Sequence, residues 1–361
     1  MGQTTSCVLF LAFVLLVFAS SGVADPLTYN VLNYGAKPGG SFDSTQALVA
    51  AWTLACGSVK PATVYVPPGR FLVRNVVFRG QCKNNAIVFS IDGTLVAPLD
   101  YKVLGSTGNW ILFEHVNGVS VYGGILDGQG TGLWTCKRSG KGCPSGATSL
   151  GFSNSKNIVI RGLTSLDSQL YHIVIDGCTN VKVDGVRVSA SGNSPNTDGI
   201  HVQSSSGVTI LNSRIGTGDD CVSVGPGTDN LWIENMACGP GHGISIGSLG
   251  KEAEEPGVQN VTHAIMIDVE NPMVIDQYYC PDEKNCPGLV SGVEISDVTY
   301  QDIHGTSATE VAVKFDCSPR YPCRDIKLED VKLSYRNKPA EASCSNADGT
   351  ASGFIQPSSC L

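Results

Sequence analysis

The sequence lacks long hydrophobic runs. Its one extended apolar segment, Val8–Phe18, is well short of the roughly 20 residues that a membrane-spanning helix needs. The small residues Gly22-Val-Ala24 follow it and suit signal-peptidase cleavage, so residues 1–24 are predicted to be a secretory signal and not a membrane anchor. Because no later segment is apolar enough to span a bilayer, we expect a soluble, secreted protein with no membrane partner.

Basic stripes and amphipathic helical patterns are also scarce. The net charge of −8, with no basic stripe, argues against a nucleic-acid partner, because phosphate binding needs clustered Lys and Arg. Long helical stretches are few and no linker interrupts the chain. We therefore predict that residues 25–361 form a single all-β domain, and we expect a monomer.

Cysteine is abundant. The sequence has 14 cysteines, of which Cys7 falls in the predicted signal, and in an exported protein near-sequence pairs indicate disulfides. Cys178 is left over among the apolar residues Ile173-Val-Ile175 and Val181, which favours an inert core thiol. Spacing does not prove connectivity, but the predicted pairs are Cys56–Cys82, Cys136–Cys143, Cys221–Cys238, Cys280–Cys286, Cys317–Cys323 and Cys344–Cys360.

A short motif recurs along the chain: Gly, Asn or Asp followed by alternating β-formers. Consecutive copies lie 23 to 62 residues apart, and a weaker copy at Asn260-Val-Thr262 divides the longest interval. Spacings of this size are typical of a solenoid. The copies are Gly118-Val-Ser-Val121, Asn157-Ile-Val-Ile160, Asn180-Val-Lys-Val183, Gly207-Val-Thr-Ile210, Asn230-Leu-Trp-Ile233, Gly292-Val-Glu-Ile295 and Asp325-Ile-Lys-Leu328.

The content of each repeat selects the type of solenoid. Leucine-rich repeats share the period but need a framework of Leu and Asn, whereas the inward positions here are mostly Ile and Val. We therefore predict a right-handed parallel β-helix. Asp43-Ser-Thr-Gln46 resembles a capping box that opens a helix through Ala47, Leu48, Ala51 and Leu54. That helix is predicted to cap the open end of the solenoid.

Polar clusters interrupt the apolar pattern at Asn196-Thr-Asp198, Gly218-Asp-Asp-Cys221 and Gly241-His-Gly243. Asp198 and Asp220 are 22 residues apart, as are Asp220 and His242, so adjacent coils should place these side chains about 4.8 Å apart on one face. A single Asp-Asp is more often a turn, but stacked acids indicate a catalytic site. We expect neither a cofactor nor a metal there, because His/Cys ligand spacing is absent.

These clusters carry a family resemblance. Ser194-Pro-Asn-Thr-Asp-Gly-Ile-His201, Gly218-Asp-Asp-Cys221 and Gly241-His-Gly-Ile-Ser-Ile-Gly247 resemble the motifs of plant polygalacturonases, glycoside hydrolase family 28. The likeness extends from Tyr29-Asn-Val-Leu-Asn-Tyr-Gly-Ala36 to Ile275-Asp-Gln277 and is closest to pollen-type, exo-acting members. It implies a cell-wall enzyme that hydrolyses the α-1,4 bonds of pectin with inversion.

The resemblance also implies residue roles. Asp219 would protonate the leaving oxygen while Asp198 and Asp220 activate water, and His242 would hold the hydrogen-bond pattern or touch substrate. Asn196 would orient the site, with a turn role as the alternative. Tyr300 resembles a substrate-binding tyrosine, although a strand aromatic is an equal alternative.

The sequence departs from the family after the Gly-His-Gly cluster. An Arg-Ile-Lys motif that should hold the substrate carboxylate is missing, and no Lys or Arg occurs from Glu252 through Glu283. We infer that about one coil is absent, that the stack can close without it, and that activity is weakened. Lys251 and Lys314 are candidate substitutes. A non-catalytic pectin-binding protein and, less favoured, a polysaccharide lyase are the competing interpretations.

Overall fold

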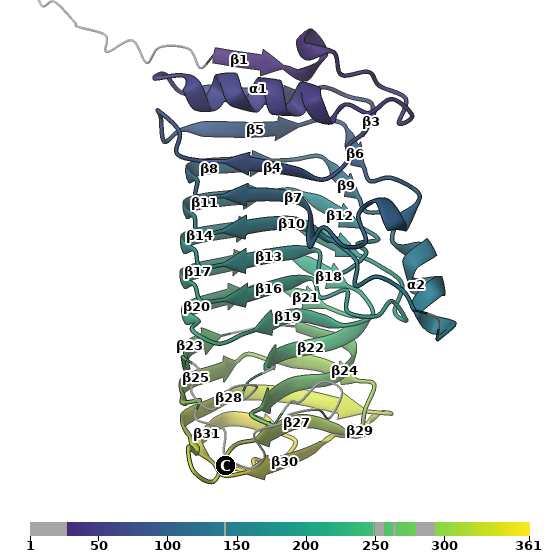
Figure 1. The fold of residues 1–361 in the computed structure, drawn as a ribbon. Helices are drawn as coiled ribbons and strands as arrows, with labels where there is room; N and C mark the ends of the chain where they lie inside the picture. The colour runs from purple at the N-terminus through teal and green to yellow at the C-terminus, as the bar shows by residue number, and fades with distance from the viewer. Residues whose placement is uncertain (1–26, 141, 248, 250–255, 263–264, 279–292) are drawn as a thin grey trace, which may run out of the picture.

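The computed structural model describes residues 27–140, 142–247, 249, 256–262, 265–278 and 293–361. Within these ranges the chain winds into stacked coils of parallel strands, so the predicted parallel β-helix is confirmed (Figure 1). The predicted signal segment and the predicted Cys280–Cys286 disulfide lie outside the described residues.

Three columns of strands run along the stack. The first column comprises β1 (Leu27–Asn30), β2 (Ala62–Val66), β5 (Ile87–Ile91), β8 (Asn117–Tyr122), β11 (Lys156–Arg161), β14 (Thr179–Asp184), β17 (Ser206–Leu211), β20 (Asp229–Glu234), β23 (Val258–Thr262), β25 (Ile295–Gln301), β28 (Cys323–Tyr335) and β31 (Ala347–Gln356). The second comprises β3 (Arg70–Leu72), β6 (Thr94–Val96), β9 (Ile125–Asp127), β12 (Thr164–Leu166), β15 (Arg187–Ser189), β18 (Arg214–Gly216), β21 (Ala237–Cys238), the first part of the long strand β24 (Ile265–Asp276), and β26 (His304–Ser307). The third comprises β4 (Val76–Arg79), β7 (Asn109–Glu114), β10 (Thr148–Ser153), β13 (Ile173–Asp176), β16 (Ile200–Gln203), β19 (Asp220–Val224), β22 (Gly241–Ile246), β24 (Ile265–Asp276), β27 (Val311–Asp316) and β30 (Glu341–Ser345). The short β29 (Lys338–Pro339) pairs antiparallel with β28.

The recurring motif forms the strands of the first column. Its opening residue takes the left-handed conformation, with φ of 57° at Asn157, 56° at Asn180 and 66° at Gly207. Gly, Asn and Asp tolerate this conformation best, which explains why they open each copy. The Asn180 side-chain amide donates to the Asn157 side-chain oxygen at 2.7 Å, so these residues also form a ladder between coils.

One predicted copy of the motif is wrong. Gly292 lies outside the described residues, whereas Asp297 has a φ of 54° and Val298 pairs in register with Val261. The in-register copy is therefore Asp297-Val-Thr-Tyr300, and Tyr300 occupies the second inward position of the repeat.

Helix α1 (Thr45–Gly57) covers the amino-terminal end of the stack, as predicted (Figure 1). Trp52 packs on Phe78 and Phe113, with ring centroids 5.3 and 5.5 Å away. Leu54, which was expected on the buried face, is 45% exposed, and Ala55 is buried in its place. The remaining helices are α2 (Thr131–Arg138) and the 3-10 turns η1 (Val31–Tyr34) and η2 (Tyr101–Val103).

Disulfides join neighbouring coils and turns. Five of the predicted pairs are present, namely Cys56–Cys82, Cys136–Cys143, Cys221–Cys238, Cys317–Cys323 and Cys344–Cys360. Cys178 is unpaired and buried, and burial raises the pKa of its thiol to about 11. Its burial confirms the core position that its apolar neighbours predicted.

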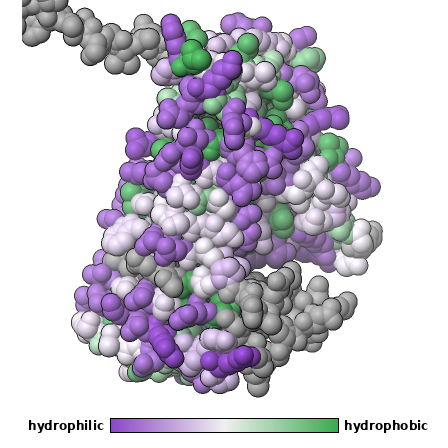
Figure 2. Space-filling view, turned by 60° about the vertical axis from the view of Figure 1, so that its left-hand side comes forward, coloured by the Kyte–Doolittle hydropathy of each residue, from purple (hydrophilic) through white to green (hydrophobic). Residues whose placement is uncertain are grey.

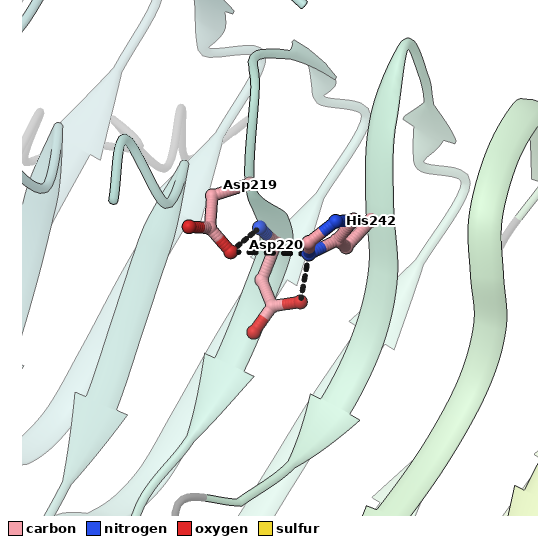
Figure 3. Close-up of side chains that lie close together, drawn as sticks. All are labelled: Asp219, Asp220 and His242. Atoms are coloured by element: carbon pink, nitrogen blue, oxygen red, sulfur yellow. Dashed lines mark hydrogen bonds and ion pairs between the residues drawn. The ribbon is translucent and has the colours of Figure 1, made fainter. Parts of the chain in front are cut away.

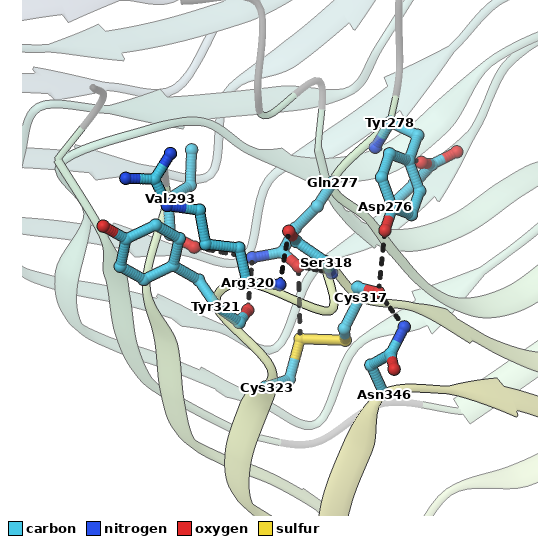
Figure 4. Close-up of a disulfide and its surroundings, with 10 residues drawn as sticks. All are labelled: Asp276, Gln277, Tyr278, Val293, Cys317, Ser318, Arg320, Tyr321, Cys323 and Asn346. Atoms are coloured by element: carbon cyan, nitrogen blue, oxygen red, sulfur yellow. Dashed lines mark hydrogen bonds between the residues drawn. A yellow bond between two sulfur atoms is a disulfide. The ribbon is translucent and has the colours of Figure 1, made fainter. Parts of the chain in front are cut away.

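Gln277 anchors the carboxy-terminal coils (Figure 4). Its side chain is buried, donates to the Val293 carbonyl at 2.6 Å and accepts from the Ser318 backbone N–H. The Cys317–Cys323 disulfide closes the adjacent turn. A buried amide whose donor and acceptor are both satisfied fixes the relative position of these segments.

The stack closes across the junction where a coil was inferred to be missing, with shifts of register along β24. Strand β23 pairs with β20 through Leu231 and Val261, and β24 pairs with β22 through His242 and Glu270. On their other edges, β23 pairs with β25 and β24 pairs with β27. Solenoid coils contact only their neighbours, so such a closure keeps the fold intact.

The face of the molecule drawn in Figure 2 is largely polar. Hydrophilic residues cover much of the face in Figure 2, with hydrophobic residues scattered singly among them. No helix in the described part of the chain is long and apolar enough to cross a membrane.

Candidate active site

The three polar clusters lie one above another on the third column. Asp220 pairs in register with His242, and Ile200 pairs with Val222, which aligns Asp198 with Asp220. The predicted stacking at 22-residue intervals is therefore observed. Parallel strands of adjacent coils are about 4.8 Å apart, so three carboxyl groups and an imidazole share one patch.

Glycines let the backbones of these coils approach closely. Gly241 has a φ of 127°, and a Cβ there would lie 2.5 Å from the Asp219 carbonyl oxygen. A Cβ on Gly243 would overlap the carbonyl oxygen of Pro272. The glycines on both sides of His242 are thus required to seat its coil between the neighbouring ones.

Asp219 receives three hydrogen-bond donors, and those from Asp220 and His242 are drawn in Figure 3. The backbone N–H groups of Asn196 and Asp220 donate to its two carboxylate oxygens, each at 3.0 Å, and His242 Nδ1 lies 3.2 Å from Oδ1. Asn196 takes a left-handed φ of 54°, which directs its N–H to the carboxylate. Asn196 therefore orients Asp219 through its backbone N–H and is at the same time a turn residue, so both roles expected for it apply.

Asp220 is the more enclosed of the adjacent aspartates. Its side chain is 18% exposed and accepts a hydrogen bond from the Ser245 hydroxyl. Burial and the negative charge of Asp219 raise the pKa of Asp220 to about 7. A carboxyl of this pKa holds or releases a proton in the mildly acidic range.

His242 is surrounded by acids. Its Nδ1 faces Asp219 and lies 3.7 Å from Asp220 Oδ1, and its Nε2 lies 3.3 Å from Glu270 Oε2. The hydrogen bond with Asp219 and the charges of all three carboxylates raise the pKa of His242 to about 9. The imidazole is therefore cationic at neutral and acidic pH.

Asp198 is the most deeply placed of the three acids. It is 6% exposed, and burial together with the charges of Asp220 and Asp219 raises its pKa well above the ordinary value. A hydrogen bond from Ser223 opposes this shift. Desolvated carboxyls beside other acids are characteristic of catalytic sites.

The cluster lies in an elongated cleft along the third column, with a volume of about 820 Å³. Its walls carry Tyr171, which stacks on His201 at 5.2 Å between ring centroids. The full lining is Gly108, Asn109, Thr148, Leu170, Tyr171, Val174, Asn196, Asp198, His201, Gln203, Asp219, Asp220, Ser223, Gly225, Pro226, His242, Ser245, Ile246, Gly247, Asn271, Val274, Asp276 and Lys314. A long cleft suits a chain-like ligand.

Tyr300 is not part of this site, so the prediction that it binds substrate is wrong. It is 2% exposed and stacks on Phe315 in the core at 5.6 Å. Its inward position in the repeat accounts for this burial, and burial raises the pKa of its hydroxyl. Tyr300 is therefore a buried aromatic residue of a strand, which was the alternative interpretation.

Sequence reasoning missed Ser223, Ser245 and Glu270. The two serines lie in register with each other, and each hydrogen-bonds a catalytic candidate. Because they are 22 residues apart, the same period that aligned Asp220 with His242 would have found them. Glu270 follows the altered junction, where a β-bulge shifts the register, so the period gives no signal for it.

The donor set also bears on metal binding. One ligand atom from each of Asp219, Asp220 and His242 lies within 4.8 Å of the others, so the three could surround a cation. A metal ligand must present a neutral imidazole, whereas His242 has a pKa of about 9. Binding of a cation by these three residues would therefore compete with protonation of His242.

Known proteins share both the sequence and the fold. A polygalacturonase of Prunus persica is 64% identical over 384 aligned positions, covering 97% of this chain and 98% of the relative. An exopolygalacturonase of Platanus acerifolia is 39% identical over 91% of this chain and 96% of its own length. The crystal structure of endo-xylogalacturonan hydrolase from Aspergillus tubingensis covers 91% of this chain and 99% of its own, with a TM-score of 0.71 and 20% identity, and shares its β-helical fold.

The matches also bear on the altered junction. The alignment with the Prunus persica relative has 384 positions, more than the 361 residues of this chain, so the relative contains residues without a counterpart here. The sequence model of glycosyl hydrolases family 28 matches residues 56–265 and 262–353, two segments that meet where the missing coil was inferred. With nearly the whole length accounted for, this chain belongs to glycosyl hydrolases family 28.

Proposed function

We propose that this protein is a secreted polygalacturonase that hydrolyses α-1,4-galacturonosidic bonds of pectin in the cell wall, acting as a monomer. The observation that carries the proposal is the stack of Asp198, Asp219, Asp220 and His242 at the centre of an elongated cleft. The names of the relatives from Prunus persica and Platanus acerifolia support the substrate, and the second favours exo action.

In the proposed mechanism Asp219 donates a proton to the leaving glycosidic oxygen. Its carboxylate is held by two backbone N–H groups and by His242, so it points to a fixed place in the cleft. Asp198 and Asp220 remove a proton from the attacking water. Inversion needs about 6.5 to 9.5 Å between acid and base to admit that water, a separation that Asp198, on the coil before Asp219, can provide. Asp220 lies closer, with a carboxylate oxygen within 4.8 Å of one on Asp219, and completes the proposed pair of bases.

The electrostatics supply both protonation states. Since the pKa of Asp220 is about 7, the carboxyl cluster retains a proton at mildly acidic pH, and the proposed roles require that this proton resides on Asp219 and leaves Asp220 ionised when substrate is bound. Adjacent carboxyls share such a proton, so one can act as acid while another is ionised. The raised pKa of Asp198 also makes it a stronger base when ionised.

The test is the release of reducing ends from de-esterified polygalacturonate at mildly acidic pH. Asp219→Asn should lower the rate by a factor of about 10² to 10⁴. Asp302→Asn is the matched control, because Asp302 pairs with His304 at 2.6 Å on the surface and should leave the rate unchanged. Ultraviolet-absorbing, unsaturated ends would identify a lyase and overturn the proposal.

One observation favours a second candidate, a pectin-binding protein without turnover. Among the described residues that line the cleft, Lys314 is the one Lys or Arg, although pectin is a polyanion. Binding of oligogalacturonate without release of reducing ends, unchanged by Asp219→Asn, would establish this alternative.

A further inference from the structure

The charge of the cleft is unfavourable for an acidic polysaccharide. Its lining includes Asp198, Asp219, Asp220 and Asp276. His242 is cationic, but three carboxylates already surround it, including Glu270 on the strand that follows the altered junction. A substrate that carries one carboxylate per sugar therefore needs another cation in the cleft.

Lys314 lies on the same face as the catalytic cluster. One lateral row of the third column runs through Ser223, Ser245, Val274 and Lys314 in register. Two strand spacings separate the backbones of Ser245 and Lys314, about 10 Å, and a lysine side chain reaches several ångströms from its Cα. Since Ser245 hydrogen-bonds Asp220, the ammonium group can approach a sugar next to the cleavage point.

Lys314 is also available for a ligand. Its side chain is exposed and lines the cleft. In the part of the chain that the structure describes, no carboxylate lies within 4.0 Å of its ammonium group. Asp276, which also lines the cleft, lies on the same face two residues beyond Val274, the strand partner of Lys314.

We propose that Lys314, the one Lys or Arg among the described residues that line the cleft, binds the carboxylate of a galacturonate unit adjacent to the scissile bond. The inference rests on the proposed polygalacturonase function. Lys314 would bind substrate through an ionic contact with the sugar carboxylate. It lies on β27, which follows the altered junction in the chain.

The experiment compares Lys314→Met and Lys314→Arg with Lys327→Met, an exposed lysine on β28 outside the cleft. For de-esterified oligogalacturonate, Lys314→Met should lower kcat/KM roughly tenfold, Lys314→Arg should retain most of it, and Lys327→Met should match the wild type. Binding is then measured in the Asp219→Asn background with the same oligosaccharide and with its methyl ester, whose carboxylates are neutral.

If Lys314 contacts the carboxylate, Lys314→Met weakens binding of the acid and leaves binding of the methyl ester unchanged. Equal weakening of both ligands would indicate a structural effect and overturn the proposal, as would no effect on either. Normal hydrolysis by Lys314→Met would refute only the role of Lys314. If the wild type neither hydrolyses nor binds the oligosaccharide, the proposed function itself has failed.

Discussion

Asp220→Asn should inactivate the enzyme and stabilise it at neutral pH. The pKa of Asp220 is about 7 in the folded protein, against an ordinary value of 3.8, chiefly because of burial and then because of Asp219. The folded state therefore binds a proton that the unfolded state releases between pH 4 and 7. The contribution of Asp220 to the free energy of unfolding is therefore largest below pH 4. It falls by up to about 4 kcal/mol as the pH rises through 7.

Asparagine removes the ionisation and keeps the shape. Its amide oxygen can still accept the hydrogen bond of the Ser245 hydroxyl. The attraction between Asp220 and His242, whose closest atoms are 3.7 Å apart, is lost and offsets part of the gain. We expect the variant to equal the wild type near pH 4 and to exceed it by about 1 to 3 kcal/mol at pH 7.5.

The assay is thermal unfolding followed by circular dichroism from pH 4 to 8. Asp184→Asn is a control of opposite sign, because hydrogen bonding from Asn212 and the charges of Lys182 and Arg161 lower the pKa of Asp184. That variant should lose stability at neutral pH, with the difference from the wild type vanishing in acid. A Tm difference for Asp220→Asn that is negative at neutral pH, or independent of pH, would refute the reasoning.

Three further predictions concern individual groups. EDTA should leave hydrolysis unchanged, because the proposed mechanism places the proton transfers on Asp198, Asp219 and Asp220 and uses no metal; activity lost in EDTA and restored by a divalent cation would contradict this. Glu270→Gln should lower the pKa of His242 in an NMR titration, since one of its carboxylate partners is removed, whereas the exposed Glu341→Gln should not; identical titrations would exclude the Glu270 contact. Cys178, buried with a pKa of about 11, should resist thiol reagents in the folded protein, and rapid labelling mapped to Cys178 would show that it is accessible.

The fold and the centre of the site could be predicted because a β-helix converts sequence spacing into spatial neighbours. Residues one coil apart stack, so the 22-residue intervals among Asp198, Asp220 and His242 were enough to bring them together. Near-sequence pairing was equally informative for disulfides such as Cys221–Cys238, which bridges two of the coils that carry the site.

The same logic fails where the interval between repeats departs from the regular period. Around Gly292 the motif pattern fitted the wrong residues, and the in-register copy begins at Asp297, which turns Tyr300 into the core. The contact between His242 and Glu270 depends on a β-bulge that the spacing does not encode. Burial of individual carboxyls likewise depends on neighbouring coils and not on local sequence.

The most direct test of the central claim is the anomeric configuration of the first product, followed by proton NMR during hydrolysis of an α-linked oligogalacturonate. If Asp219 acts as acid and Asp198 and Asp220 activate water, the new reducing end should appear as the β anomer before it equilibrates. Initial release of the α anomer would require a covalent intermediate on one carboxylate, and an absence of any product from folded protein would refute the catalytic role of the cluster.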